Sequence, residues 1–96
     1  MKAIVSVIGT DTKGIIAKVS TALYEMNINI ENISQTIMQK YFTMIMAVDF
    51  SDSALNFHEI QTNLTNLGVK IGVEIHIQLQ SIFDSMHQVS ISSNKI

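Results

Sequence analysis

The sequence predicts an α+β domain of the ferredoxin-like class. The expected order is βαββαβ, with a four-stranded antiparallel sheet, two helices on one face of the sheet and a short C-terminal helix. Three observations lead to this prediction. Segments in which apolar and polar residues alternate are separated by segments whose apolar residues have helical spacing. A tight polar loop follows the first apolar run. A chain of 96 residues is long enough for one modest core.

The first strand and the first helix are predicted from the pattern of apolar residues. Residues 2–8 are apolar on both alternating faces, which suits a central strand covered by helices. From Ile15 the apolar positions follow helical spacing, so a helix is expected over 13–26. Asp11 or Thr12 could cap its unpaired N–H groups.

A hairpin should follow this helix. Over 28–37 the apolar positions change from even to odd numbers, which predicts a bulge near Glu31 and Asn32. A turn around 39–41 returns the chain into 42–50, where every even position is apolar. These two segments are expected to pair as antiparallel strands.

The second half contains one helix and one strand. After a turn at 51–53, Phe57, Ile60 and Leu64 follow helical spacing, and Gly68 is expected to end this helix. Residues 69–80 alternate between apolar and polar, as in a strand at a sheet edge or in a half-solvated sheet. One domain is therefore expected over 1–80, with a helical extension at 81–88 and a flexible tail at 89–96.

Connections in such a fold are right-handed, and crossovers are expected from the first strand to the third and from the second to the fourth. With both helices on one face, the other face of the sheet is bare. Ile45 and Ala47 are expected to contribute apolar side chains to it, and a face or edge of this kind invites pairing with a second copy.

Composition narrows the function classes. Hydrophobic residues make up 47% and charged residues 15%, so the apolar excess must enter a core or an interface, and a homodimer or higher homo-oligomer is expected. The net charge is −2 and the chain has no Arg, which argues against nucleic acid as a partner. No Cys is available for thiol chemistry, and the first apolar run is too short for a signal or membrane segment. A cytoplasmic protein without a cofactor is expected.

The polar loop Gly9–Gly14 lies between a strand and the start of a helix, a place where carboxylates and phosphates bind to free N–H groups. Its glycine spacing is that of a phosphate loop, but Ile15 and Ile16 replace the required Lys and Ser or Thr. The pairs Glu74/His76 and Asp84/His87 each offer only two metal ligands, and no serine lies in a hydrolase motif. Catalysis is therefore not expected.

The stretch from Thr10 to Ser20, followed by Leu23, Met26 and the segment 28–33, resembles the ACT domain. The resemblance covers about residues 2–80, and the chain looks like a small stand-alone, single-domain branch that is similar to the glycine-cleavage regulator and to the N-terminal part of formyltetrahydrofolate hydrolases. It implies that an amino acid or related metabolite binds between two copies. The residues it implicates are Thr10, Asp11, Lys13 and Gly14 on one side and Asn29 and Ile30 on the other.

Each of these residues also has a purely structural interpretation. Asp11 and Thr12 could cap the helix, Gly14 could permit a tight turn, and Asn29 could be a turn residue. The leading hypothesis is a regulatory dimer that binds a small metabolite and transmits its presence to a regulated protein. The alternatives are a protein-interaction module without a small ligand and, least supported, an enzyme of one-carbon metabolism.

Overall fold

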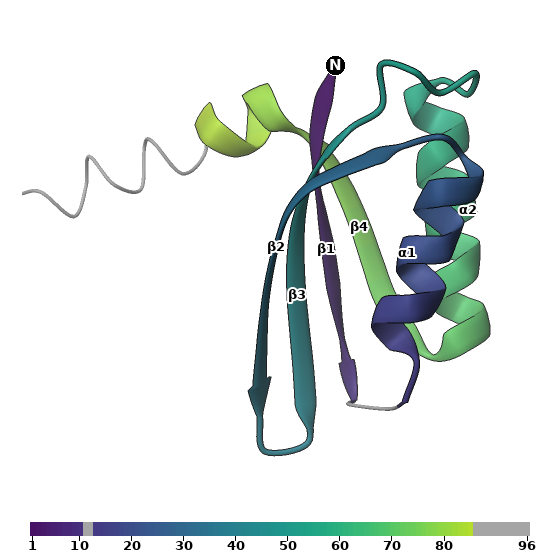
Figure 1. The fold of residues 1–96 in the computed structure, drawn as a ribbon. Helices are drawn as coiled ribbons and strands as arrows, with labels where there is room; N and C mark the ends of the chain where they lie inside the picture. Colours follow the sequence, from purple (N-terminus) through teal and green to yellow (C-terminus); the bar gives the residue numbers. More distant parts are fainter. Residues whose placement is uncertain (11–12, 86–96) are drawn as a thin grey trace, which may run out of the picture.

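A computed structural model describes residues 1–10 and 13–85 of the chain. Its elements are β1 (Lys2–Thr10), α1 (Ile15–Glu25), β2 (Asn29–Met38), β3 (Tyr41–Asp49), α2 (Phe57–Ile71) and β4 (Val73–Leu79), and a short helical segment over 80–85 follows (Figure 1). The predicted ferredoxin-like fold with a short C-terminal helix is thus confirmed. The predicted tail at 89–96 and the last residues of the predicted extension lie outside the described residues.

The sheet has the strand order β2-β3-β1-β4, and all neighbouring strands are antiparallel. Both long helices cover one face (Figure 1). The expected crossovers were wrong, because α1 joins β1 to β2 and α2 joins β3 to β4. Each helix therefore connects two parallel strands, and one antiparallel strand lies between them: β3 lies between β1 and β2, and β1 lies between β3 and β4.

The core lies between the sheet and the two helices. Alternate residues of β1 and β3 point toward the helices, among them Val5 and Val7, and the predicted core residues Met44 and Met46 are fully buried. The helices contribute Val19, Leu23, Ile60 and Leu64 to the same cluster. At about 25 cal/mol per Å² of apolar surface, this burial is the main favourable term for folding.

The parity change in β2 is a β-bulge, as predicted. Ile30 lies opposite Val48 and Asn32 lies opposite Ala47, so Glu31 is the extra residue. The hairpin that follows turns at Gln39 and Lys40, where Gln39 has a φ of 57°. The bulge changes which side chains of β2 face the helices, from even-numbered residues such as Ile30 before it to odd-numbered residues such as Ile33 after it.

The predicted end of the second helix at Gly68 was wrong. Helix α2 continues to Ile71, so Val69 and Ile71 belong to the helix and not to β4, and the helix ends at Gly72 with φ 80°. Gly68 serves a different purpose, because a Cβ atom there would lie 2.6 Å from the carbonyl oxygen of Val73. A glycine that permits close packing and a glycine that ends a helix look alike in sequence.

Candidate ligand site at the two ends of the sheet

The loop after β1 ends at Gly14, which is the N-cap of α1. Its φ of 85° lies in the left-handed region that glycine adopts without strain. Helix α1 therefore begins two residues later than the predicted start at 13. Asp11 and Thr12, the predicted capping residues, lie outside the described residues, so their capping role stays a prediction. The first N–H groups of the helix receive no hydrogen bond from a side chain of their N-cap.

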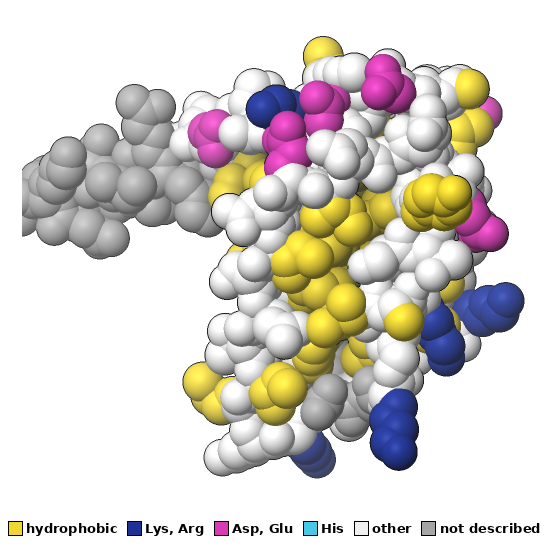
Figure 2. All heavy atoms as spheres, in the orientation of Figure 1, with side chains coloured by type: hydrophobic (Ala, Val, Ile, Leu, Met, Phe, Trp, Pro, Cys, Tyr) yellow, Lys and Arg dark blue, Asp and Glu magenta, His cyan; other side chains and the backbone are white. Residues whose placement is uncertain are grey.

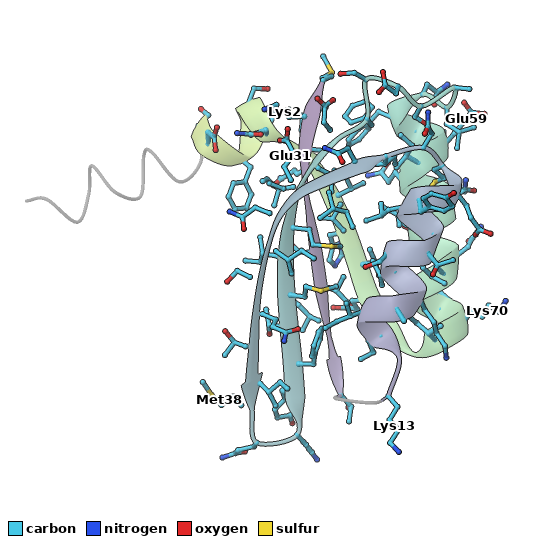
Figure 3. All side chains as sticks on the ribbon, in the orientation of Figure 1. Lys2, Lys13, Glu31, Met38, Glu59 and Lys70 are labelled. Atoms are coloured by element: carbon cyan, nitrogen blue, oxygen red, sulfur yellow. The ribbon has the colours of Figure 1, made fainter. Side chains whose placement is uncertain are left out.

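The described residues leave room beside Gly14. Among residues 1–10 and 13–85, a Cβ atom built there would meet one atom within 4 Å, the Cε of Lys18 at 3.7 Å. Lys13 is exposed, and its side chain projects outward from the lower end of the molecule (Figure 3). A carboxylate could therefore approach the start of α1 closely and find a cation nearby.

Thr10 closes β1 and lines a cleft of about 450 Å³ at the same end of the sheet. The cleft also involves Gly9, Tyr41 and the turn between α2 and β4. Asp11 lies outside the described residues, so the predicted contact between its carboxylate and an amino group stays a prediction.

Asn29 and Ile30 lie at the start of β2. Asn29 lines a polar cleft of about 370 Å³ that is formed by Tyr24, Asn27, Ile28, Asn29, Asp49 and Asp52. Ile30 lies opposite Val48, and its side chain packs partly buried against the core. A ligand or partner at this strand edge would therefore meet the backbone of Ile30 rather than its side chain.

The two predicted halves of the site lie at opposite ends of one subunit. Asn29 lies opposite Asp49, which lies opposite Lys2, whereas Thr10 ends β1 at the other side. Eight residue steps along β1 separate these rows, about 26 Å at roughly 3.3 Å per residue. One amino acid cannot contact both halves within a single chain.

The acidic residues of the Asn29 cleft were not predicted from the sequence. Asp49 accepts hydrogen bonds from the hydroxyl (2.6 Å) and the backbone N–H (2.9 Å) of Ser51, and the N-terminal ammonium lies 3.4 Å away. These contacts, that of the Ser51 hydroxyl first, lower the pKa of Asp49 from 3.8 to about 2. The side chain of Asn27 donates to the carbonyl of Asp52 at 2.9 Å and shapes the cleft.

Charges are distributed unevenly along the strands (Figure 2). We call the end with the Asn29 cleft the acidic end; it carries Glu25, Glu31, Asp49, Asp52, Glu59 and Asp84. We call the opposite end the basic end; it carries Lys13, Lys18, Lys40 and Lys70. Among the described residues the exceptions are the N-terminus and Lys2, which pairs with Glu31 at 3.2 Å, and Glu74. The predicted halves of the site therefore have opposite electrostatic character.

A separate groove runs between the two helices. Its volume is about 410 Å³, and it is lined mainly by small and apolar residues, including Ala17, Ala22, Leu67 and Ile71. A neighbouring cleft of about 380 Å³ shares Ala22 and Leu67 with it. The groove lies away from the predicted ligand residues.

Two further observations concern metal and membrane. His76 and Glu74 lie 4.0 Å apart and both are well exposed, and residues 1–10 and 13–85 contain no cluster of three or more His, Asp or Glu that could hold a metal ion. No helix within the described part of the chain has the length and apolar character needed to cross a membrane.

Comparison with known proteins decides the family. The ACT domain family matches residues 2–78. The chain belongs to the ACT domain family. A UPF0237 protein of Clostridium acetobutylicum is 57% identical over 89 residues, which cover 93% of this chain and all of that protein. The resemblance to small stand-alone members is thereby confirmed.

Solved structures agree with this assignment. The ACT domain protein from Streptococcus pneumoniae is 41% identical, with a TM-score of 0.78, and the match covers 86% of this chain and 93% of that one. A putative glycine cleavage system transcriptional repressor follows at 25% identity and a TM-score of 0.71, covering 80% of this chain and 44% of that one. A formyltetrahydrofolate deformylase from Pseudomonas putida, at 11% identity and a TM-score of 0.72, shares the fold over 81% of this chain and 28% of its own length.

Proposed function

We propose that this ACT-domain protein is a cytoplasmic regulator that binds an amino acid or related metabolite between two copies of the chain. The observation that carries the proposal is the separation of the two half-sites by the length of the sheet. Thr10, Lys13 and Gly14 lie at the basic end, and Asn29 lies at the acidic end. A site that uses both halves needs a second copy in reversed orientation.

The free edge of β2 is the surface on which two copies would pair. Apart from the partly buried Ile30, the residues of β2 are exposed, and the strand contains neither Lys nor Pro, the residues that usually protect an edge. Ile33 and Ile37 point to the helix side of the sheet, opposite Met46 and Phe42, yet are 42% and 54% exposed. Figure 2 shows hydrophobic side chains gathered between the sheet and α1 on this side.

A two-fold axis at this edge would join two β2 strands antiparallel into one eight-stranded sheet. This rotation places the Thr10–Gly14 end of one copy beside the Asn29 end of the other, and it does so twice. It also places a basic end beside an acidic end, which is electrostatically favourable. The pair would therefore contain two equivalent sites.

The chemistry of each composite site suits a zwitterion. The N–H groups at the start of α1 and the ammonium of Lys13 would bind the carboxylate of the ligand. Asp11 would accept a hydrogen bond from the amino group, and the acidic cleft around Asn29 in the second copy would favour the same positive charge. Asn29 would also contact the ligand side chain or carboxylate.

Regulation would follow from a difference in affinity. A ligand that bridges two copies binds the paired arrangement better than any other, so it shifts the population toward that arrangement. A regulated protein would recognise this shift.

A second candidate function is a protein-interaction module without a small ligand. The apolar groove between α1 and α2 favours it, since such a groove can accommodate a hydrophobic segment of another protein. Under this alternative the pairing of copies would be structural, and metabolites would not alter stability.

Thermal unfolding in the presence of metabolites tests the proposal. The melting temperature is measured with each of the twenty amino acids and with common folate and nucleotide metabolites at millimolar concentration. A ligand at about 100 times its Kd adds about 2.7 kcal/mol of stability, a rise of several degrees for a domain of this size. One clear rise identifies the ligand, whereas no rise for any compound in a well-folded dimer favours the interaction module.

Variants then locate the site. Asp11→Ala, Lys13→Ala and Asn29→Ala should each reduce the ligand-induced rise by much more than they lower the melting temperature without ligand. Lys70→Ala is the matched control, because Lys70 shares the basic end but lies on α2 in the groove between the helices, away from the β2 edge. Equal losses of binding and stability in Asp11→Ala would leave this residue only a structural role.

A further inference from the structure

We propose that the groove between α1 and α2 is a docking site for an acidic amphipathic helix of another protein. The groove and its neighbouring cleft share Ala22 and Leu67, so together they form one surface, which we call the helix groove. In the proposed function, a regulated protein must contact the dimer. The inference names the surface and the chemistry of that partner, and in this respect it rests on the proposed function.

The helix groove has an apolar floor that the fold leaves uncovered. Its half-buried members are Ala22, Met26, Leu67 and Ile71. Figure 1 shows no strand or further helix of the described residues on the outer side of α1 and α2. The lining includes no residue of β2, so pairing of two copies at the β2 edge would leave the groove open.

The walls of the groove favour a helix over an extended segment. They are the sides of two helices, whose backbone N–H and C=O groups are bonded within each helix. An extended segment would find no backbone partner there and would leave its own N–H and C=O groups unpaired against an apolar floor. A helix satisfies these groups internally, so it can enter the groove without this cost.

The dimensions of the groove also suit a helix. Ala17, Thr21 and Ala22 on α1 are short side chains, so a third helix can approach closely. From Ala17 to Met26 the groove follows α1 for about 14 Å at 1.5 Å per residue. This length corresponds to about two and a half helical turns, enough for apolar anchors at positions i, i+3 or i+4, and i+7 of the partner.

The charges around the groove select an acidic partner. Lys18 lies on one wall and Lys70 on the other, and both are exposed. Within residues 1–10 and 13–85, neither ammonium group forms an ion pair. Two unpaired cations beside an apolar floor attract anionic side chains. Glu25 lies seven residues beyond Lys18, so the partner should carry a basic side chain about seven residues from its acidic ones.

Fluorescence anisotropy with designed peptides tests the inference. The probe is a fluorescein-labelled, alanine-rich peptide of about 18 residues, because shorter isolated helices are marginal in water. It carries leucine at i, i+4 and i+7, two Glu beside this stripe in one turn, and one Lys seven residues away. A matched peptide has Gln in place of each Glu. The full chain should bind the Glu peptide about tenfold more tightly than the Gln peptide, and salt should reduce this difference.

Reversal of one charge in the groove tests the electrostatic part. Lys70→Glu should weaken binding of the Glu peptide by about tenfold or more and should strengthen binding of a third peptide with Lys in place of each Glu. Lys40→Glu changes the net charge equally but lies at the hairpin turn, so it should leave both affinities nearly unchanged. The metabolite-induced rise in melting temperature should persist in Lys70→Glu, since Lys70 lies outside the proposed ligand site.

A pair of tryptophan variants tests the position of the peptide. Thr21→Trp places a large side chain in the groove and should weaken binding of the Glu peptide by about tenfold. Thr65→Trp is the matched control, because Thr65 is exposed on α2 and does not line the groove. On addition of the Glu peptide, the largest NMR shifts of backbone amides should occur at Ala17, Ala22 and Leu67.

Three results would overturn the proposal. The first is equal affinity for the Glu and Gln peptides, including no binding of either. The second is binding of the Glu peptide that neither Lys70→Glu nor Thr21→Trp weakens. The third is a shift of the groove amides with protein concentration in the absence of peptide, since a second copy of the chain would then occupy the groove.

The outcome is separable from that of the proposed function. A rise in melting temperature with a metabolite, without binding of the Glu peptide, would refute the docking site alone. Binding of the Glu peptide in the groove, without a rise for any metabolite, would refute metabolite regulation and leave the docking site standing.

Discussion

Replacement of Gly68 by alanine tests the close approach of α2 and β4. In an exposed helix interior this substitution usually stabilises, by up to about 1 kcal/mol. Here the added Cβ would lie 2.6 Å from the carbonyl oxygen of Val73 and 3.3 Å from the Cγ1 atom of Ile75. The first of these atoms belongs to the backbone of β4 and cannot rotate away.

The expected result is therefore a net loss. Overpacking a core typically costs 1–3 kcal/mol, which exceeds the gain in helix propensity, so Gly68→Ala should lower the free energy of unfolding by about 1–2 kcal/mol. For a domain of this length the melting temperature should fall by about 5–15 °C. Thermal unfolding followed by circular dichroism measures the change, and urea unfolding checks it at one temperature.

Gly72 provides a matched control. It has a φ of 80°, and no atom of the described residues lies within 4 Å of a Cβ atom built there, so its requirement is conformational rather than steric. Gly72→Ala should cost about 1–2 kcal/mol, and Gly72→Asn should cost less because asparagine tolerates the left-handed region. At Gly68 asparagine should be worse than alanine. A Gly68→Ala variant as stable as the wild type would refute this packing of α2 against β4.

Two further stability predictions concern single hydrogen-bonded groups. In the capping box of α2, the backbone N–H groups of Asn56 and Glu59 each donate to the side chain of the other at 2.9 Å. Asn56→Ala should therefore lower the free energy of unfolding in urea by about 1 kcal/mol. Replacement of the exposed Gln61 by alanine is the control and should leave this free energy unchanged. The pKa of Asp49 is lowered to about 2 in the folded protein, so its contribution to stability is present above pH 4 and is lost as the pH falls toward 2. Asp49→Asn should flatten the decrease of the urea midpoint over this range, and an unchanged slope would mean that other groups cause it.

Much of the fold could be predicted from apolar alternation. The even positions of 42–50 and the parity change near Glu31 gave the strands and the bulge correctly, because the period of a strand fixes which side chains face the core. The end of α2 could not be predicted. Gly68 and Gly72 are equally compatible with a helix terminus in sequence, and only the contact with Val73 distinguishes them.

The candidate site could also be predicted only in part from the sequence. Its two segments were identified by a resemblance, and their placement at opposite ends follows from topology, since β1 and β2 are parallel and one segment ends a strand while the other begins one. The acidic end was not predicted. Its carboxylates come from residues 25 to 84, and only the folded chain brings them to one end.

The central position of β1 also has a consequence for synthesis. Its outer partner is the last strand, with Ala3 opposite Leu79, so pairing requires residues 76 positions apart. At about 5–20 residues per second, roughly 4–15 s pass between the appearance of β1 and that of its final partner. During this interval the nascent chain carries an apolar strand with an incomplete set of hydrogen bonds. A chain that stops before Val73 would lack β4 altogether and would leave one edge of β1 open to other polypeptides.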